Sequence, residues 1–255
     1  MKYHIYMCVF LLLSACDTNF DINQKGIKYP STNEKKSESN TEASSKQEED
    51  LNKKIKNTLI DDLRNLIETA NEHKEKYIEK MKEEPANQYE MGFNGLVWGK
   101  GQESASADTE RSIRFRRHNY TVLSTIDTSN LKELGNNIFH GTENIRFFNL
   151  LNELGDTLDV VTDHLYPKKE DLGKLNISTL KEFKEALKKI LSTMKNTSET
   201  LNQLLLDYQN DKNLIKTDAT KLKSHVDTLF DQLEEKAKEV DKLKNFIINT
   251  PFLRF

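Results

Sequence analysis

Residues that could perform chemistry are sparse in this 255-residue chain, and their spacing does not match a catalytic or metal-binding motif. The six histidines lie one to a segment, at His4, His73, His118, His140, His164 and His225. No H-E-x-x-H pair and no G-x-S-x-G elbow occur, and Gly99-Lys100-Gly101 lacks the rest of a phosphate-binding loop. We therefore expect no metal, no cofactor and no enzymatic activity, and we place His118 and His225 at the surface or its boundary.

The sharpest local charge feature is the stretch RSIRFRRH at residues 111–118. It supplies a candidate partner-binding surface made of Arg111, Arg114, Arg116 and Arg117. A helix with four guanidinium groups could bind an acidic protein, a glycosaminoglycan or a phosphate. The simpler interpretation, which the composition favours, is a helix face that pairs with neighbouring carboxylates such as Glu110.

Cys16 is the residue whose position most clearly indicates a chemical fate. Near its start the chain has a basic residue, Lys2, and an apolar segment from about residue 5 to residue 13. Cys16 comes directly after Leu13-Ser14-Ala15. This pattern is typical of a secretory signal peptide, and the last four residues resemble the lipobox of bacterial lipoproteins. The apolar segment is shorter than the ~20 residues of a spanning helix. We predict a signal peptide at 1–15, with lipid attachment and membrane anchoring at Cys16; an ordinary cleaved signal and an uncleaved anchor are the alternatives.

Composition describes an exported, highly polar protein without disulfides. Cys8 leaves with the signal peptide, so Cys16 is the only cysteine of the mature chain, and a single copy can form no disulfide. The net charge is −3 from 38 Lys and Arg and 41 Asp and Glu, which argues against a nucleic-acid-binding protein. Charged residues make up 31% and hydrophobic residues 36%, enough for one core if they form stripes.

The elements that must position these residues are predicted to be helices. Residues 16–45 are poor in apolar side chains and are expected to form a flexible tether, followed by a helical domain at 46–255. Apolar residues at three- and four-residue steps predict helices at about 45–84, 108–126, 130–141, 142–166 and 179–209 and from 218 onward. The first is expected to begin at the capping box of Ser45 and the fifth at that of Thr179. No stretch alternates as a strand would, so we predict an all-α antiparallel bundle of about five to seven helices, with close helix packing at Gly155.

The last helix carries a narrow apolar seam. Its members are Leu222, Val226, Leu229, Leu233, Val240, Leu243 and Ile247. Such a coiled-coil-like seam either completes the bundle of its own chain or pairs with a second copy. We favour the second alternative, so these residues are the predicted seam of a homodimer.

Three longer stretches point to a known family. They are EEDLNKKIKNTLIDDLRNLIETA, DTERSIRFRRHNYTVLS and LLLDYQNDKNLIKTDATKLKSHVDTLF. They resemble the paralogous surface lipoproteins of Lyme-disease spirochaetes (Borrelia), the family of complement regulator-acquiring surface protein 1. The resemblance runs from the lipobox to the last helix and is weakest between residues 134 and 155.

The resemblance implies a lipid-anchored protein on the outer face of the outer membrane, an all-helical fold and a homodimer formed largely through the C-terminal helix. It also implies capture of the host complement regulators factor H and factor H-like protein 1, which protects the bacterium from complement. Some members are similar in fold but bind terminal complement components or plasminogen, so these partners, and a role as an adhesin, are the alternatives.

Overall fold

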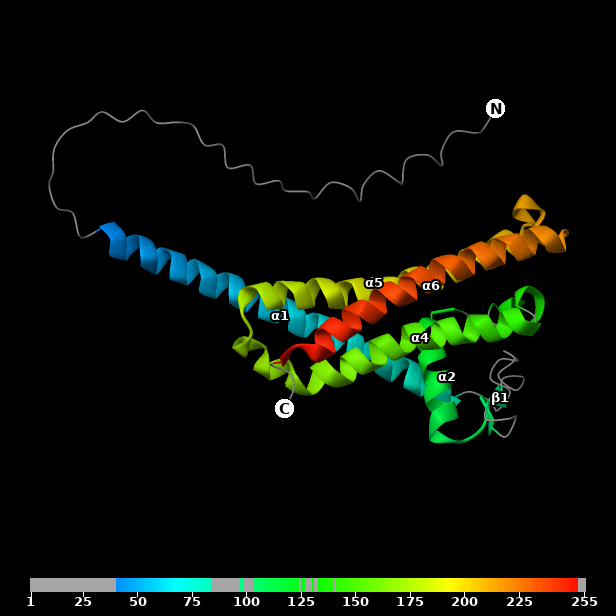
Figure 1. Cartoon of the computed structure of the whole chain (residues 1–255), viewed down its shortest axis with the longest axis horizontal. Helices are drawn as coiled ribbons and strands as arrows, with labels where there is room; N and C mark the ends of the chain where they lie inside the picture. Colours follow the sequence, from blue (N-terminus) through cyan, green and yellow to red (C-terminus); the bar gives the residue numbers. More distant parts are fainter. Residues whose placement is uncertain are drawn as a thin grey trace, which may run out of the picture. The chain divides into compact units, whose positions relative to one another are not determined.

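The computed structural model describes residues 40–83, 97–98, 103–123, 125–126, 130, 133–139 and 141–251. Contacts group Ser45–Phe255 into one compact unit. Cys16, the predicted signal peptide and most of the predicted tether lie outside the described residues. In the described part the α-helices α4, α5 and α6 run side by side and α2 lies across α4, which confirms the predicted all-α bundle (Figure 1).

The first helix, α1 (Asn40–Glu83), is longer at its start than the sequence predicts. The capping box at Ser45 lies inside the helix, because the preceding NTEAS contains no proline or glycine that would stop a helix. The apolar stripe begins to be buried only at Leu59, which is 8% exposed, whereas Leu51 is 58% exposed. Leu63, Ile67 and Tyr77 continue the buried stripe along the helix.

A short antiparallel ribbon precedes the second helix. Strand β1 (Val97–Trp98) pairs with β2 (Glu103–Ser104), although no strand is predicted from the sequence. Strands of two residues are too short to show alternation in the sequence, and the all-α fold class is unaffected by them. The carboxylate of Glu103 accepts hydrogen bonds from the hydroxyls of Thr109 and Ser112, which ties the ribbon to the start of α2 (Glu110–Leu123).

The centre of the bundle is built on α4 (Gly141–Leu165). Before it, the helix predicted at about 130–141 is found in part: residues 130 and 133 are α-helical, a π-helical turn, η3 (Leu134–Ile138), follows, and Phe139 is extended. The crossing of α2 and α4 lies at Gly155, where a Cβ atom would overlap the backbone carbonyl of His118. The predicted close helix packing at Gly155 is therefore confirmed.

The two longest C-terminal helices form an antiparallel hairpin. After η4 (Tyr166–Lys174), α5 spans Ile177–Gln209 and α6 spans Ala219–Asn249. The side chain of Asn176, not Thr179, caps α5: it accepts a hydrogen bond from the Thr179 backbone N–H at 2.9 Å. Asp218 caps α6 at the predicted start. The intervening turn, with η5 (Lys212–Leu214), lies where the sequence predicts it.

Candidate functional site

The arginines of α2 divide into two that support the fold and two that face solvent. Arg116 is buried, 6% exposed, and its Nη1 donates to the backbone carbonyls of Ala105 and Ala107, both at 2.7 Å. It thereby holds α2 against the turn after β2. The prediction of a partner-binding surface is wrong for Arg116, because its donors are already used inside the fold.

Arg117 is also engaged internally, since its Nη2 donates to the carboxylate of Asp159 on α4. By contrast, Arg114 is exposed, and Arg111 is exposed with its guanidinium 3.8 Å from the carboxylate of Glu103. Of the four predicted contact residues, only Arg111 and Arg114 thus remain on the surface. Residues three apart share one side of a helix, which is why these two stay together.

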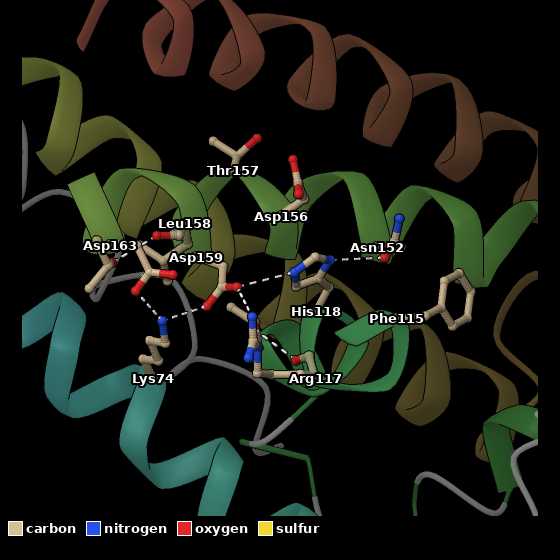
Figure 2. Close-up of polar contacts among 12 residues, drawn as sticks. Lys74, Phe115, Arg117, His118, Asn152, Asp156, Thr157, Leu158, Asp159 and Asp163 are labelled. Atoms are coloured by element: carbon tan, nitrogen blue, oxygen red, sulfur yellow. Dashed lines mark hydrogen bonds and ion pairs between the residues drawn. The ribbon is translucent and has the colours of Figure 1, made fainter. Parts of the chain in front are cut away.

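Asp159 is the centre of a buried charged cluster that joins three helices (Figure 2). Lys74 from α1 lies with Nζ at 3.0 Å from Oδ1, and Tyr77 from the same helix donates its hydroxyl hydrogen to Oδ1 at 3.3 Å. His118 from α2 lies with Nε2 at 3.3 Å from Oδ2, next to Arg117. Lys74 also pairs with Asp163, one turn farther along α4. One carboxylate therefore fixes α1 and α2 against α4.

The pKa values within the cluster follow from burial and from the neighbouring charges. Burial alone would raise the pKa of Asp159, but the hydrogen bond from His118 and the charges of Arg117 and Lys74 outweigh it and hold the pKa well below its usual range. Burial and the negative charge of Asp159 raise the pKa of Tyr77 above its usual range. The cluster therefore holds an ionised carboxylate beside a neutral tyrosine at neutral pH.

His118 corrects the expectation of a surface histidine, because it is only 3% exposed. Its Nδ1 lies 3.0 Å from the side-chain oxygen of Asn152, while Nε2 faces Asp159. Sequence reasoning missed this residue because its two partners are 34 and 41 positions away in the chain. The intermediate exposure of His225 is consistent with the predicted boundary position.

A polar groove opens between α2 and α4 beside this histidine. It has a volume of about 460 Å³ and is lined by Arg111, Arg114, Phe115, His118, Asn149, Asn152 and Asp156. The carboxylate of Asp156 lies 3.1 Å from Nζ of Lys244 on α6, so its charge is balanced from outside the groove. We call this feature the α2–α4 groove.

The predicted dimer seam on α6 faces the core of its own chain. Buried in that core are Val226, Leu229, Leu233, Val240 and Ile247, while Leu222 and Leu243 are partly buried against it. The helix packs on α4 and α5. The five buried side chains are covered by their own chain and are not accessible to a second copy, so the seam interpretation is wrong for them, whereas Leu222 and Leu243 are only partly covered. The homodimer itself stays a prediction.

The described residues were also compared with the requirements of a metal site and of a membrane-spanning helix. Among them, no group of three or more His, Cys, Asp or Glu side chains is arranged to hold a metal ion. None of the described helices combines the length and the apolar character needed to cross a bilayer.

Comparison with known proteins gives the family. Residues 78–251 match the family described as Borrelia Bbcrasp-1 domain containing protein. The crystal structure of BSE31 from the Lyme disease agent Borrelia spielmanii is 43% identical to the chain with a TM-score of 0.73, and the match covers 76% of this chain and 99% of BSE31. The chain belongs to the Bbcrasp-1 domain family of Borrelia. The resemblance found in the sequence is thereby confirmed at the level of the family.

Two structures from Borrelia burgdorferi share the Bbcrasp-1 fold at lower identity. A C-terminal proteolytic fragment of an outer surface protein is 18% identical, with a TM-score of 0.58, and the match covers 74% of this chain and 99% of the fragment. The outer surface lipoprotein BBA64 is 16% identical, with a TM-score of 0.56, over 76% of this chain and 96% of BBA64. At these identities the likeness shows the fold alone. No curated protein matches the chain significantly.

Proposed function

We propose that the chain is a surface lipoprotein that captures the host complement regulators factor H and factor H-like protein 1. Membership in the Bbcrasp-1 domain family over residues 78–251 carries this proposal. The two similar Borrelia burgdorferi structures, which come from an outer surface protein and an outer surface lipoprotein, support placement at the cell surface. In the proposal, a lipid on Cys16 attaches the helical domain to the outer membrane, on its extracellular face.

The fold suits a receptor for a large modular plasma protein. The cluster at Asp159 fixes α1, α2 and α4 to one another, so the exposed face of α2 is presented by a rigid scaffold. A rigid surface loses little conformational entropy on binding. Arg111 and Arg114, the exposed half of the predicted surface, are the proposed contact residues on this face. Exposed guanidinium groups would act mainly on the association rate and its salt dependence.

The homodimer remains part of the proposal, with one restriction from the structure. Because five of the seven predicted seam residues are buried within one chain, we propose an interface formed largely by other, exposed side chains. Pairing of two copies would raise the effective concentration of contact sites for a partner.

Biolayer interferometry tests the proposed function. Residues 17–255, which lack the predicted acyl acceptor, are immobilised and exposed to purified human factor H at physiological salt. We expect saturable binding that weakens in the double variant Arg111→Ala, Arg114→Ala. A matched control is Lys181→Ala, Lys188→Ala, which removes the same charge from exposed positions of α5 and should bind as the wild type does.

Each outcome separates the parts of the proposal. Absence of wild-type binding would reject capture of human factor H, and the same assay with terminal complement components and with plasminogen would then examine the alternative partners. Saturable binding that is equal in both double variants would support regulator capture and exclude the α2 arginines as its contacts.

A further inference from the structure

The α2–α4 groove brings together one face of each of two helices. Arg111, Arg114, Phe115 and His118 recur at the three- and four-residue steps that place side chains on one side of α2. On α4, Asn149, Asn152 and Asp156 recur in the same way. The helices touch at Gly155 and His118, so His118 joins the lining of the groove to the point where the two helices meet.

The groove contains both hydrogen-bond donors and hydrogen-bond acceptors. Arg111 and Arg114 contribute guanidinium donors, and Asn149 and Asn152 contribute amides that both donate and accept. Asp156 contributes a carboxylate whose charge is balanced by Lys244. The charge of Arg111 is partly offset by Glu103 at 3.8 Å. Arg114 makes no hydrogen bond or ion pair with another residue in the part of the chain that the structure describes. The groove is therefore cationic at Arg114 and accepting at Asp156.

The part of the groove around His118 is positioned by contacts within the protein. His118 lies with Nε2 3.3 Å from the carboxylate of Asp159 and with Nδ1 3.0 Å from the side-chain oxygen of Asn152. The amide nitrogen of Asn152 consequently points away from the imidazole ring (Figure 2). A donor oriented by buried neighbours needs no ordering when a ligand binds.

This combination of groups discriminates among ligands. A site for inorganic phosphate would surround the anion with donors, whereas the carboxylate of Asp156 adds an acceptor that suits hydroxyl donors. Hydroxyl groups also suit the two asparagines, and Phe115, half-buried against the core, adds an apolar side chain to the lining. The guanidinium of Arg114 suits a carboxylate or sulfate.

We propose that the α2–α4 groove binds an anionic sugar unit, with its carboxylate or sulfate on Arg114 and its hydroxyls on Asn152 and Asp156. The volume of about 460 Å³ lies in the range of about 300–1,000 Å³ that is usual for small-ligand sites. Sialylated and sulfated glycans both supply such a unit. The proposed site shares Arg111 and Arg114 with the proposed regulator surface but does not depend on complement regulators, because isolated saccharides are sufficient to test it.

The test measures binding of three saccharides to residues 17–255: 3′-sialyllactose, a heparin disaccharide and neutral lactose. Isothermal titration calorimetry and saturation-transfer NMR detect the binding. We expect at least one acidic saccharide to bind and lactose not to bind. Arg114→Gln should weaken binding about tenfold or more, the size expected when a charge-assisted contact is lost. Lys188→Gln removes the same charge from an exposed position of α5 outside the groove and should change binding less than about twofold. Asn149→Trp, which fills the groove and keeps its charge, should block binding.

The outcomes distinguish the source of the sugar and can overturn the proposal. Binding of sialyllactose alone assigns the groove to sialylated glycans, and binding of the heparin disaccharide alone assigns it to sulfated chains. The proposal fails if neither acidic saccharide binds, if Arg114→Gln and Lys188→Gln weaken binding equally, or if Asn149→Trp binds as the wild type does. A protein that binds saccharide but not factor H would leave this site intact while rejecting the proposed function.

Discussion

Replacing Asp159 by asparagine tests whether the buried cluster holds the helices together. The Asp159 side chain is 5% exposed, and its carboxylate contacts Lys74, Arg117, His118 and Tyr77. Asparagine keeps the size but removes the charge, so two cations lose their main buried partner. Breaking a buried ion pair in this way costs about 3–5 kcal/mol, a large part of the ~5–15 kcal/mol by which a folded domain is usually stable.

The assay is urea and thermal unfolding followed by circular dichroism at neutral pH. For a domain of this size, each kcal/mol corresponds to roughly 2–4 °C, so the Tm should fall by about 6–20 °C. The matched control is Asp163→Asn. Its carboxylate is on the same helix and pairs with the same Lys74, but its side chain is 62% exposed, so we expect a loss below about 1 kcal/mol. Equal losses for the two variants, or a loss below about 1 kcal/mol for Asp159→Asn, would refute this account of the cluster.

The same residue predicts an acid dependence with a definite sign. The pKa of Asp159 is depressed in the folded protein, whereas a carboxylate in the unfolded chain titrates near about 3.9. The unfolded chain therefore takes up the proton first, and the stabilising contribution, complete at neutral pH, declines as the pH falls below about 4. Wild-type protein should lose more unfolding free energy between pH 5 and pH 3 than Asp159→Asn does. Parallel pH profiles for the two proteins would contradict the assignment.

Three further changes test packing, the seam and the anchor. Gly155→Ala should destabilise by about 1–3 kcal/mol because the new methyl group meets the carbonyl of His118, whereas Gly173→Ala, with open space around its Cβ, should be close to neutral in the same unfolding assay. Leu233→Ala should cost about 2–5 kcal/mol without changing the mass measured by light scattering, since Leu233 is buried within its own chain; a stable protein that changes only from dimer to monomer would restore the seam. Cys16→Ala should abolish labelling with radiolabelled palmitate, and unchanged labelling would exclude Cys16 as the acceptor.

The helices were predictable because their signals are local. Three- and four-residue apolar spacing is a property of the segment itself, and the cap of α6 at Asp218 bonds only to the N–H groups of Thr220 and Lys221. The start of α1 was not predictable in the same way. The capping-box residues around Ser45 are tolerated in a helix interior, and no breaker separates them from Asn40.

The candidate site was only half predictable, because it depends on contacts between helices. Spacing places Arg111 and Arg114 together, but nothing within the stretch indicates that Arg116 meets carbonyls of the turn after β2 or that Arg117 meets Asp159. The apolar seam of α6 is also a local pattern whose partner cannot be predicted from the sequence. Its narrow stripe is genuine, yet a stripe does not specify whether another helix of the same chain or a second copy will cover it.

The cluster and the α2–α4 groove are linked through one side chain. His118 touches Asp159 with one ring nitrogen and Asn152 with the other, so the residue that fixes α2 against α4 also orients a donor of the groove. The contact at Gly155 sets how closely the two helices approach at this point. Stability and the proposed recognition of a sugar thus draw on the same buried residues, and a substitution in the cluster should alter the groove even in a protein that remains folded. A buried polar cluster can therefore serve two purposes: it rigidifies the packing of the helices, and it orients polar side chains at the neighbouring surface.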